Sequence, residues 1–304
     1  MLNLVGLDEG AHKQSDAAPL PNSAAHCERI LAEFDTPVVV VSASPRLASP
    51  PSSVLACYGW KVADMATKKL RILCLHGYRT NVKIMQDQTR ALRRAMEPHA
   101  EFVFVTAPFE ARGPSDDVIE RLYENHTPFY EWGHITKLER QPEANDNGWY
   151  HQYVGFDRVV EHMDEQLRTH GPFDAAVGFS QGGQMLTALS MWYLHQRNER
   201  YWKCCLICSG TRVRDVGLRP LFENADGSPK RVPIPSIHII GKSDPYYNTC
   251  REHAELYADE LPDAPLKKFV FEHESGHRFP SAERHPNLYE KLSDMIRLHC
   301  QTSD

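Results

Sequence analysis

The sequence predicts an α/β fold in which helices cover both faces of a mostly parallel β-sheet. From residue 70 onward, short continuous apolar runs alternate with longer segments whose apolar residues recur at helical spacing, as in "LRILCLHG" followed by "NVKIMQDQTRALRRAM". Such runs are typical of parallel strands, which are buried on both faces because their crossover helices pack on each side. With 304 residues and 41% hydrophobic content, the chain can bury a sizeable core.

The elements follow one another in a regular order along the chain. The expected strands are "LRILCLHG", "EFVFVTAP", "FDAAVGFS", "WKCCLICSG", "IPSIHIIGKSD" and "KKFVFEHESGH". The expected helices are "NVKIMQDQTRALRRAM", "GFDRVVEHMDEQLRTHG", "QGGQMLTALSMWYLHQ" and "NLYEKLSDMIRLH". Residues 109–150 are polar and aromatic with weak periodicity, and a segment of that length between elements is typical of one that covers a site.

The N-terminal part of the chain differs in composition from the rest. It contains "SASPRLASPPSSV", and Ser, Pro and Ala in such density favour extended chain over a packed element. Met65 then precedes a short basic lead and the first strand, as at the start of many compact domains. We therefore expect residues 1–64 to be a disordered extension or absent from the mature product, and residues 65–304 to form the domain.

Charge and hydropathy exclude several classes of function. A net charge of −6, with no long basic block, argues against nucleic-acid binding. No run of eighteen apolar residues is long enough to span a membrane. The N-terminus "MLNLVGLDEG" carries acidic residues where a signal peptide has basic ones. These features predict a cytoplasmic protein, with the nucleus as a second location.

The eight cysteines do not indicate a disulfide framework or a metal site. Four of them lie in apolar, strand-like runs, where a thiol is usually a small hydrophobic group. Cys205 and Cys208 form a C-x-x-C pattern, but no second pair follows at zinc spacing. We expect neither a metal nor an organic cofactor.

A candidate nucleophile lies between a predicted strand and a predicted helix. Gly178, Ser180 and Gly182 fit the pattern G-x-S-x-G in that context, which is the one the pattern requires. A strand that turns directly into a helix crowds the positions on either side of the central residue, so only small side chains fit there. The alternative is a serine that merely caps the helix. The context favours the nucleophile.

A serine nucleophile needs a base, and four histidines are candidates. His277 comes just after the last predicted strand, in "ESGHRFP", and is the preferred base. His273 lies within the strand and is expected to point into a packed face or solvent. His253 and His285 lie in helical or loop sequence and are interpreted as surface residues.

The acid that orients the base is expected at the end of the preceding strand. Asp244 in "IIGKSDPYY" lies there, and a helix N-cap is its alternative or additional role. Asp215, in the polar stretch "TRVRDVGLRP", is the second candidate and is interpreted as a solvated charge.

The turn "LHGYRTN" after the first strand completes the predicted site. Its backbone can present the N–H of Tyr78 to a substrate carbonyl, opposite the N–H of Gln181, the residue after the nucleophile. Gly77 permits close approach of the chain. His76 is predicted to brace this loop rather than to transfer protons.

Seven motifs, taken in order, resemble those of the serine hydrolases of the yeast family of serine hydrolases and human ovarian-cancer-associated protein 2 type. They are "LCLHGYRTN", "FVFVTAP", "PFYEWGH", "GPFDAAVGFSQGG", "CLICSG", "SIHIIGKSDP" and "SGHRFP". The similarity covers roughly residues 69–300 and looks closest to plant-type members. It implies an α/β-hydrolase fold, a triad of Ser180, Asp244 and His277, and esterase or thioesterase activity on a small-molecule substrate.

Substrate selection is less constrained by the sequence. Phe129, Tyr130, Trp132 and Trp149 are candidates to line an apolar acyl pocket, although aromatic residues at such spacing are equally typical of core. Amide hydrolysis would use the same triad. A hydrolase-like fold retained as a non-catalytic binding module is the alternative from a different class. Acyl-chain length, leaving group and oligomeric state do not follow from the sequence.

Overall fold

The computed structural model describes residues 68–137, 148–261 and 268–301. All of them belong to one of the two units into which the chain divides, Leu55–Asp304. The expected N-terminal extension, residues 1–64, lies outside the described residues, so the domain boundary at residue 65 stays a prediction.

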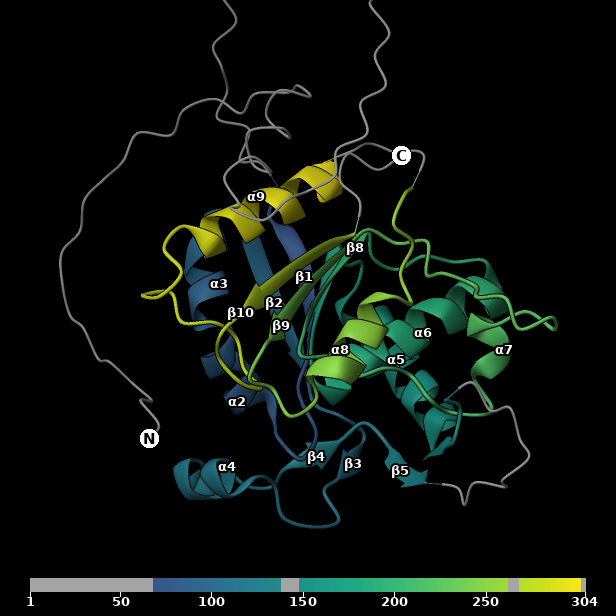
Figure 1. Ribbon diagram of the computed structural model, residues 1–304. Helices are drawn as coiled ribbons and strands as arrows, with labels where there is room; N and C mark the ends of the chain where they lie inside the picture. Colours follow the sequence, from purple (N-terminus) through teal and green to yellow (C-terminus); the bar gives the residue numbers. More distant parts are fainter. Residues whose placement is uncertain (1–67, 138–147, 262–267, 302–304) are drawn as a thin grey trace, which may run out of the picture. The chain divides into compact units, whose positions relative to one another are not determined.

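The core of the fold is a six-stranded, fully parallel sheet (Figure 1). Its strands, in spatial order, are β10 (Phe269–His273), β9 (Ser236–Gly241), β8 (Cys204–Cys208), β7 (Ala175–Phe179), β1 (Leu70–Leu75) and β2 (Ala100–Val105). Five of the six fall within a run that the sequence assigned to a strand, and β2 begins one residue before its run. The prediction of an α/β fold built on a parallel sheet is therefore confirmed.

The strand order reverses direction at the boundary between β1 and β7. From β1 the chain passes to its neighbour β2 on one side, and from β7 it proceeds through β8 and β9 to β10 on the other side. In open parallel sheets, ligands bind outside the carboxyl ends of the strands at such a reversal. Leu75 pairs with Gly178 in this register, which brings the ends of β1 and β7 to the same level.

Helices cover both faces of the sheet. In Figure 1, α3 (Arg90–Met96) and α9 (Leu288–Gln301) lie on one face, and α5 (Phe156–His170), α6 (Gln181–Arg197) and α8 (Tyr247–Ala254) lie on the other. The helix α6 is buried over most of its length, which explains why its sequence is apolar or small on nearly every side. The short helices α4 (Asp117–Leu122) and α7 (Arg219–Phe222) were not expected.

One expected helix is divided in two. The sequence predicted a continuous helix over residues 81–96, whereas the structure contains α2 (Val82–Gln88) and α3, separated at Thr89. The Thr89 hydroxyl donates to the carbonyl of Met85 at 2.7 Å. A threonine that bonds back to the preceding turn bends a helix, which accounts for the break.

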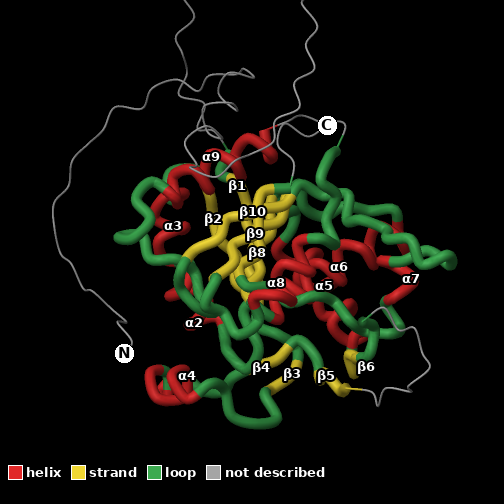
Figure 2. The backbone as a smooth tube through the Cα atoms, in the orientation of Figure 1, coloured by secondary structure: helices red, strands yellow, loops and turns green. Residues whose placement is uncertain are grey.

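The segment between β2 and α5 lies beyond one end of the sheet (Figure 2). It contains the antiparallel pairs β3 (Phe109–Glu110) with β4 (Tyr130–Glu131) and β5 (His134–Lys137) with β6 (His151–Val154). Tyr130 and Thr80 exchange two backbone hydrogen bonds, of 3.2 and 2.7 Å, which attach this segment to the turn after β1. Strands this short leave no detectable period in the sequence, so only a covering role was predicted.

Six cysteines lie in the described part of the chain, and all six are buried with free thiols; Cys27 and Cys57 lie outside it. Cys205 and Cys208 are three positions apart on β8 and therefore face opposite sides of the sheet, where they cannot bind one ion together. Burial raises the pKa of the Cys205 thiol to about 12.

Within the described ranges, no cluster of three or more His, Cys, Asp or Glu could hold a metal, and no helix could span a membrane.

His253 corrects one sequence-based interpretation, because it is completely buried instead of lying on the surface. Its Nδ1 lies 2.6 Å from the Thr211 carbonyl, and its Nε2 lies 2.8 Å from the hydroxyl of Thr187 on α6. His253 is on the inner side of α8, whose short length gave no clear helical period. Burial lowers the pKa of His253 to about 4.

This depressed pKa predicts how stability depends on pH. Between about pH 6.5 and 4, His253 binds a proton in the unfolded chain but not in the native protein. The contribution of His253 to the free energy of unfolding is therefore complete above pH 6.5. It falls by about 1.4 kcal/mol for each pH unit below that. Urea unfolding of the wild type and of His253→Gln at pH 7.5 and 5.0 tests this. We expect the variant to be less stable at pH 7.5 but to lose less stability on acidification; an equal loss in both proteins would contradict the assignment.

Candidate active site

Ser180 occupies the turn that joins β7 to α6. Its backbone has φ of 52° and ψ of −118°, a conformation that residues other than glycine rarely adopt. It holds the N-cap position of α6, yet its side chain makes no capping hydrogen bond. The hydroxyl is thus directed away from the helix backbone, which disfavours the alternative role of a simple cap.

The two glycines of the motif allow this turn to pack against β1. A Cβ added to Gly182 would lie 2.3 Å from the carbonyl oxygen of Leu75 and 2.5 Å from that of His76. A Cβ added to Gly178 would lie 2.5 Å from the Cα of Gly183. In each case the obstacle is backbone, which cannot turn aside as a side chain can. Larger residues at these positions would force α6 away from the end of β1.

Three side chains from the ends of three strands form one hydrogen-bonded chain. Ser180 Oγ lies 2.9 Å from His277 Nε2, and His277 Nδ1 lies 2.7 Å from Asp244 Oδ2. Ser180 follows β7, Asp244 follows β9 and His277 follows β10. Because a carboxylate can only accept, Nδ1 carries the imidazole proton and Nε2 is free to accept from the serine hydroxyl.

Asp244 is held ionised at neutral pH although its side chain is buried. Burial by itself raises the pKa of this carboxyl, but hydrogen bonds from His277 and from the Tyr246 backbone N–H, the latter at 2.8 Å, outweigh it and lower the pKa. The second hydrogen bond fixes the carboxylate near the start of α8. The N-cap of α8 is Tyr246, so the alternative role of Asp244 as the N-cap residue was wrong.

Aromatic rings fix the position of the imidazole. The rings of Phe179 and Tyr246 lie 5.1 and 5.4 Å from that of His277, centroid to centroid, and the Tyr246 ring approaches edge-on. Phe279 stacks on Phe179 at 5.8 Å. Tyr246 is about half exposed and is the part of this group nearest to solvent.

The turn after β1 faces Ser180, as the strand register requires. A Cβ added to Gly77 would lie 3.5 Å from the Cβ of Ser180, so the backbone of Gly77 and Tyr78 passes directly beside the serine. Gln181 is the first residue of α6, and the first N–H groups of a helix have no acceptor within it. The backbone N–H groups of Tyr78 and Gln181 thus belong to the two segments that flank Ser180.

His76 connects the loops around this turn and is completely buried. Its Nε2 accepts from the Ala107 N–H at 3.0 Å, its Nδ1 lies 2.9 Å from the Gly77 carbonyl, and its own carbonyl accepts from the Trp132 indole at 2.8 Å. Burial lowers the pKa of His76 to about 4, so the ring is neutral at physiological pH. Its contacts are those of a bracing residue.

Sequence reasoning considered only the backbone of Gln181 and missed its side chain. The buried side-chain amide accepts from the backbone N–H of Trp132 at 2.9 Å and donates to the Gly133 carbonyl at 3.1 Å. It therefore ties the start of α6 to the segment before α5. The buried carboxylate of Glu131 was also missed; it pairs with Arg79 at 3.3 Å and with His134 at 2.8 Å.

The four aromatic residues expected in an acyl pocket are placed differently. Phe129, Trp132 and Trp149 are only 6, 0 and 3% exposed and pack within the protein, whereas Tyr130 keeps an intermediate exposure. Trp149 donates its indole N–H to Glu223 at 2.9 Å and lines a cavity to which none of Ser180, Asp244 and His277 contributes. For Trp149 the expectation is wrong, because its indole finds a partner away from the serine.

Asp215, the second candidate acid, is also placed elsewhere. It is buried, and its carboxylate accepts the backbone N–H groups of Leu218, at 2.9 Å, and of Tyr153. It therefore joins the loop after β8 to β6. The interpretation of Asp215 as a solvated charge was wrong, since a nearby N–H, that of Leu218, and a sequence-distant one, that of Tyr153, satisfy it.

The topology and the position of the serine at a strand–helix turn define the class of α/β-hydrolase proteins. The chain belongs to the family described as serine hydrolase (FSH1), which matches residues 65–288. The resemblance seen in the sequence motifs is thereby confirmed.

Individual relatives are named as esterases, and solved structures are similar to the chain at low identity. The chain is 26% identical over 227 residues to Esterase CG5412 of Drosophila melanogaster, covering 73% of each chain. It is 24% identical to Esterase OVCA2 of Danio rerio, covering 74% of this chain and 97% of that one. The crystal structure of Arabidopsis thaliana SOBER1 aligns over 77% of this chain and all of that one, with 14% identity and a TM-score of 0.46. Closeness to plant-type members stays a prediction.

The crowding at Gly182 leads to a prediction about stability. In Gly182→Ala the new methyl group meets the Leu75 carbonyl, so we expect the free energy of unfolding to fall by about 1–3 kcal/mol, as for other overpacked sites. Gly133→Ala is the matched control, because its Cβ would meet the Val154 carbonyl at an ordinary 3.5 Å. Urea denaturation measures both, and equal stability of the two variants would show that the close approach is unimportant.

Proposed function

We propose that the protein is a serine esterase or thioesterase in which Ser180, His277 and Asp244 form the catalytic triad. The observation that carries this proposal is the unbroken hydrogen-bonded chain from the Ser180 hydroxyl through the imidazole to the Asp244 carboxylate. Membership of the serine hydrolase family and the esterase names of relatives support the same reaction class.

In the proposed reaction, His277 Nε2 takes the proton of Ser180 as Oγ attacks the carbonyl carbon of an ester or thioester. The negative charge on the carbonyl oxygen is stabilised by the backbone N–H groups of Tyr78 and Gln181, worth about 3 kcal/mol for each donor. The imidazolium then protonates the departing alcohol or thiol. An acyl-enzyme on Ser180 remains, and water activated by the same histidine releases the carboxylic acid.

The geometry supports this division of roles. Asp244 is ionised and holds the proton on Nδ1, so the neutral imidazole presents Nε2 to the serine. When the imidazole becomes charged during attack, the carboxylate at 2.7 Å stabilises it. Every proton and electron pair in this cycle is accounted for by side chains, backbone and water. The proposed cycle requires neither a metal nor an organic cofactor.

The alternative, a non-catalytic binding module, is disfavoured by the turn at Ser180. A non-glycine residue at φ of 52° costs on the order of 1–3 kcal/mol, and a binding module gains nothing from that strain. A fluorophosphonate probe distinguishes the two functions. Covalent labelling of Ser180 supports the hydrolase, whereas saturable binding of ligand without labelling supports the module.

Removal of the nucleophile is the first test of the proposed chemistry. We expect Ser180→Ala to reduce kcat for p-nitrophenyl esters by a factor of about 10⁴ or more, as for other enzymes that lose a triad serine. Ser228→Ala is the control, since within the described part of the chain that hydroxyl bonds to the exposed side chains of Asn224 and Asp226. Turnover by Ser180→Ala at the wild-type rate would refute the assignment. Short- and long-chain p-nitrophenyl esters would then define the preferred acyl length. An ester, a thioester and an anilide of one acyl group would separate the substrate classes.

A second test distinguishes the two acids that the sequence offered. Asp244→Asn replaces the carboxylate with an amide whose NH₂ can donate to Nδ1 and so favour the wrong imidazole tautomer, and we expect kcat to fall by a factor of about 10³–10⁴. Asp215→Asn should lower the free energy of unfolding but leave kcat close to the wild-type value, because among the described residues the Asp215 carboxylate bonds to backbone N–H groups away from the triad. Steady-state kinetics and urea unfolding of both variants measure this. A large loss of kcat in Asp215→Asn alone would reverse the assignment.

A further inference from the structure

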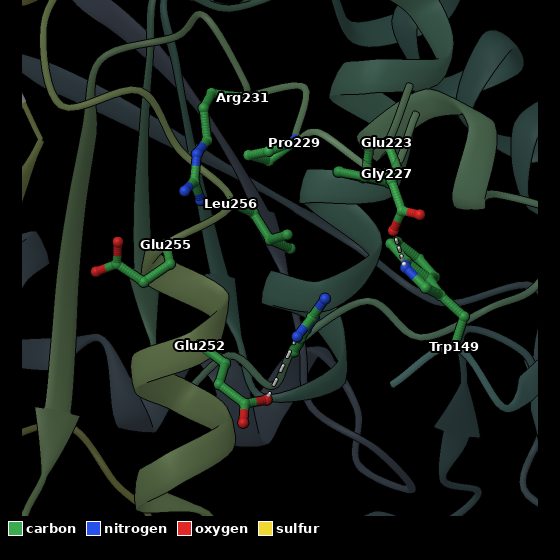
Figure 3. Close-up of a pocket in the computed structure, with 10 residues that line it drawn as sticks. Trp149, Glu223, Gly227, Pro229, Arg231, Glu252, Glu255 and Leu256 are labelled. Atoms are coloured by element: carbon green, nitrogen blue, oxygen red, sulfur yellow. Dashed lines mark hydrogen bonds and ion pairs between the residues drawn. The ribbon is translucent and has the colours of Figure 1, made fainter. Parts of the chain in front are cut away.

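A cavity of about 330 Å³ lies beside the C-terminal end of α8 (Figure 3). This volume is at the lower end of the range found for small-molecule sites. The cavity is lined by Trp149, by Phe222 at the end of α7, by Arg231, and by Glu252, Glu255 and Leu256 around the end of α8. No element of the proposed mechanism uses these side chains.

The cavity is separate from the candidate active site. Neither Ser180, Asp244 nor His277 lines it. Asp244 lies just before the start of α8, whereas the cavity lies at the other end of that helix, which at 1.5 Å per residue is on the order of 10 Å away. A ligand in the cavity is therefore not a substrate positioned for attack by Ser180.

One wall of the cavity is apolar and partly aromatic. The rings of Trp149 and Phe222 lie 5.9 Å apart, and the side chain of Leu256 adds aliphatic surface. Trp149 is fixed by its hydrogen bond to Glu223. A preformed apolar wall of this kind favours a ligand with an apolar body.

The carboxylates around the cavity each have a cationic partner. Glu223 pairs with Arg219 at 3.0 Å, and Glu252 pairs with Arg214. The Glu255 carboxylate lies 3.5 Å from the Lys268 ammonium. In each pair the carboxylate lines the cavity, whereas Arg219, Arg214 and Lys268 do not.

Arg231 is different, because its guanidinium makes no hydrogen bond or ion pair with any described residue. The residues on either side of it are bonded to the fold: the N–H of Lys230 donates to the Phe222 carbonyl at 2.8 Å, and the N–H of Val232 donates to the Leu256 carbonyl at 2.7 Å. Figure 3 shows Arg231 reaching from this loop towards Leu256. The lining thus combines an apolar wall with two arginines: Arg212, which pairs with Glu252 at 3.9 Å, and the exposed Arg231 at the edge, which has no carboxylate partner among the described residues.

We infer that this cavity binds a monoanionic carboxylic acid with an apolar body. The Arg231 guanidinium can hold a carboxylate through two parallel hydrogen bonds, while the apolar part lies against Leu256, Phe222 and Trp149. A dianion such as a phosphate monoester is disfavoured, because Glu223, Glu252 and Glu255 also line the cavity and would repel the second charge. Carboxylic acids are also the products that the proposed esterase reaction would release, but binding here does not depend on that reaction.

The test uses the full chain and the resolved indole N–H signals of its tryptophans in ¹H–¹⁵N NMR, with 4-phenylbutanoate as the probe. The Trp149 indole reports on the cavity, and the Trp132 indole, which donates to the His76 carbonyl, reports on the candidate active site. We expect a saturable shift of the Trp149 signal with an unchanged Trp132 signal. The uncharged 4-phenylbutan-1-ol and the dianionic 4-phenylbutyl phosphate should both bind at least about tenfold more weakly. A tenfold weakening corresponds to the loss of roughly one charge-assisted hydrogen-bond pair.

Variants of Arg231 complete the test. Arg231→Gln should weaken 4-phenylbutanoate binding by about tenfold or more, while Arg94→Gln, which removes an exposed arginine on α3, should leave it unchanged. Ester turnover should be the same in the wild type and both variants. A failure of the carboxylate-binding inference is therefore distinguishable from a failure of the proposed triad. The inference is overturned if Arg231→Gln binds like the wild type, if the phosphate binds as tightly as the carboxylate, or if only the Trp132 signal moves.

Discussion

The site depends on one close contact, the approach of the start of α6 to the end of β1. Gly182 leaves no room for a Cβ between itself and the carbonyls of Leu75 and His76. This contact fixes the strained backbone of Ser180 and places it beside the Gly77–Tyr78 turn. Because interiors are close-packed and respond to a single added methyl group, such a contact determines geometry as well as stability. The serine and the turn facing it are thus positioned together.

Polar groups extend this arrangement beyond the sheet. His76 bonds to the loop after β2, and the Gln181 amide bonds to the backbone at Trp132 and Gly133. The segment before α5 is consequently attached to both flanks of the serine. Asp244 and His277 reach the same edge because β9 and β10 run parallel to β7. The reversal of strand order between β1 and β7 provides the open position at which these groups meet.

The sequence was most informative where a feature depends on neighbouring residues. Buried strands, long helices and the glycines around Ser180 are local patterns, and they predicted the sheet and the residues of the hydrogen-bonded chain. It was least informative for Asp215, His253 and Trp149. Each was expected to be exposed or near the substrate. Each is instead buried and bonded to partners 42 or more positions away, such as Tyr153 for Asp215 and Glu223 for Trp149. Long-range contacts of this kind leave no periodic signal.

The central claim is that the Ser180 hydroxyl, activated by His277, becomes acylated during turnover. Its most direct test is mass spectrometry of the protein quenched in acid shortly after mixing with a p-nitrophenyl ester, with peptide mapping of the adduct. The account predicts the mass of one acyl group on the peptide that contains Ser180, and its disappearance as hydrolysis proceeds. Hydrolysis at full rate with no acylated peptide, or with the acyl group on another residue, would contradict it.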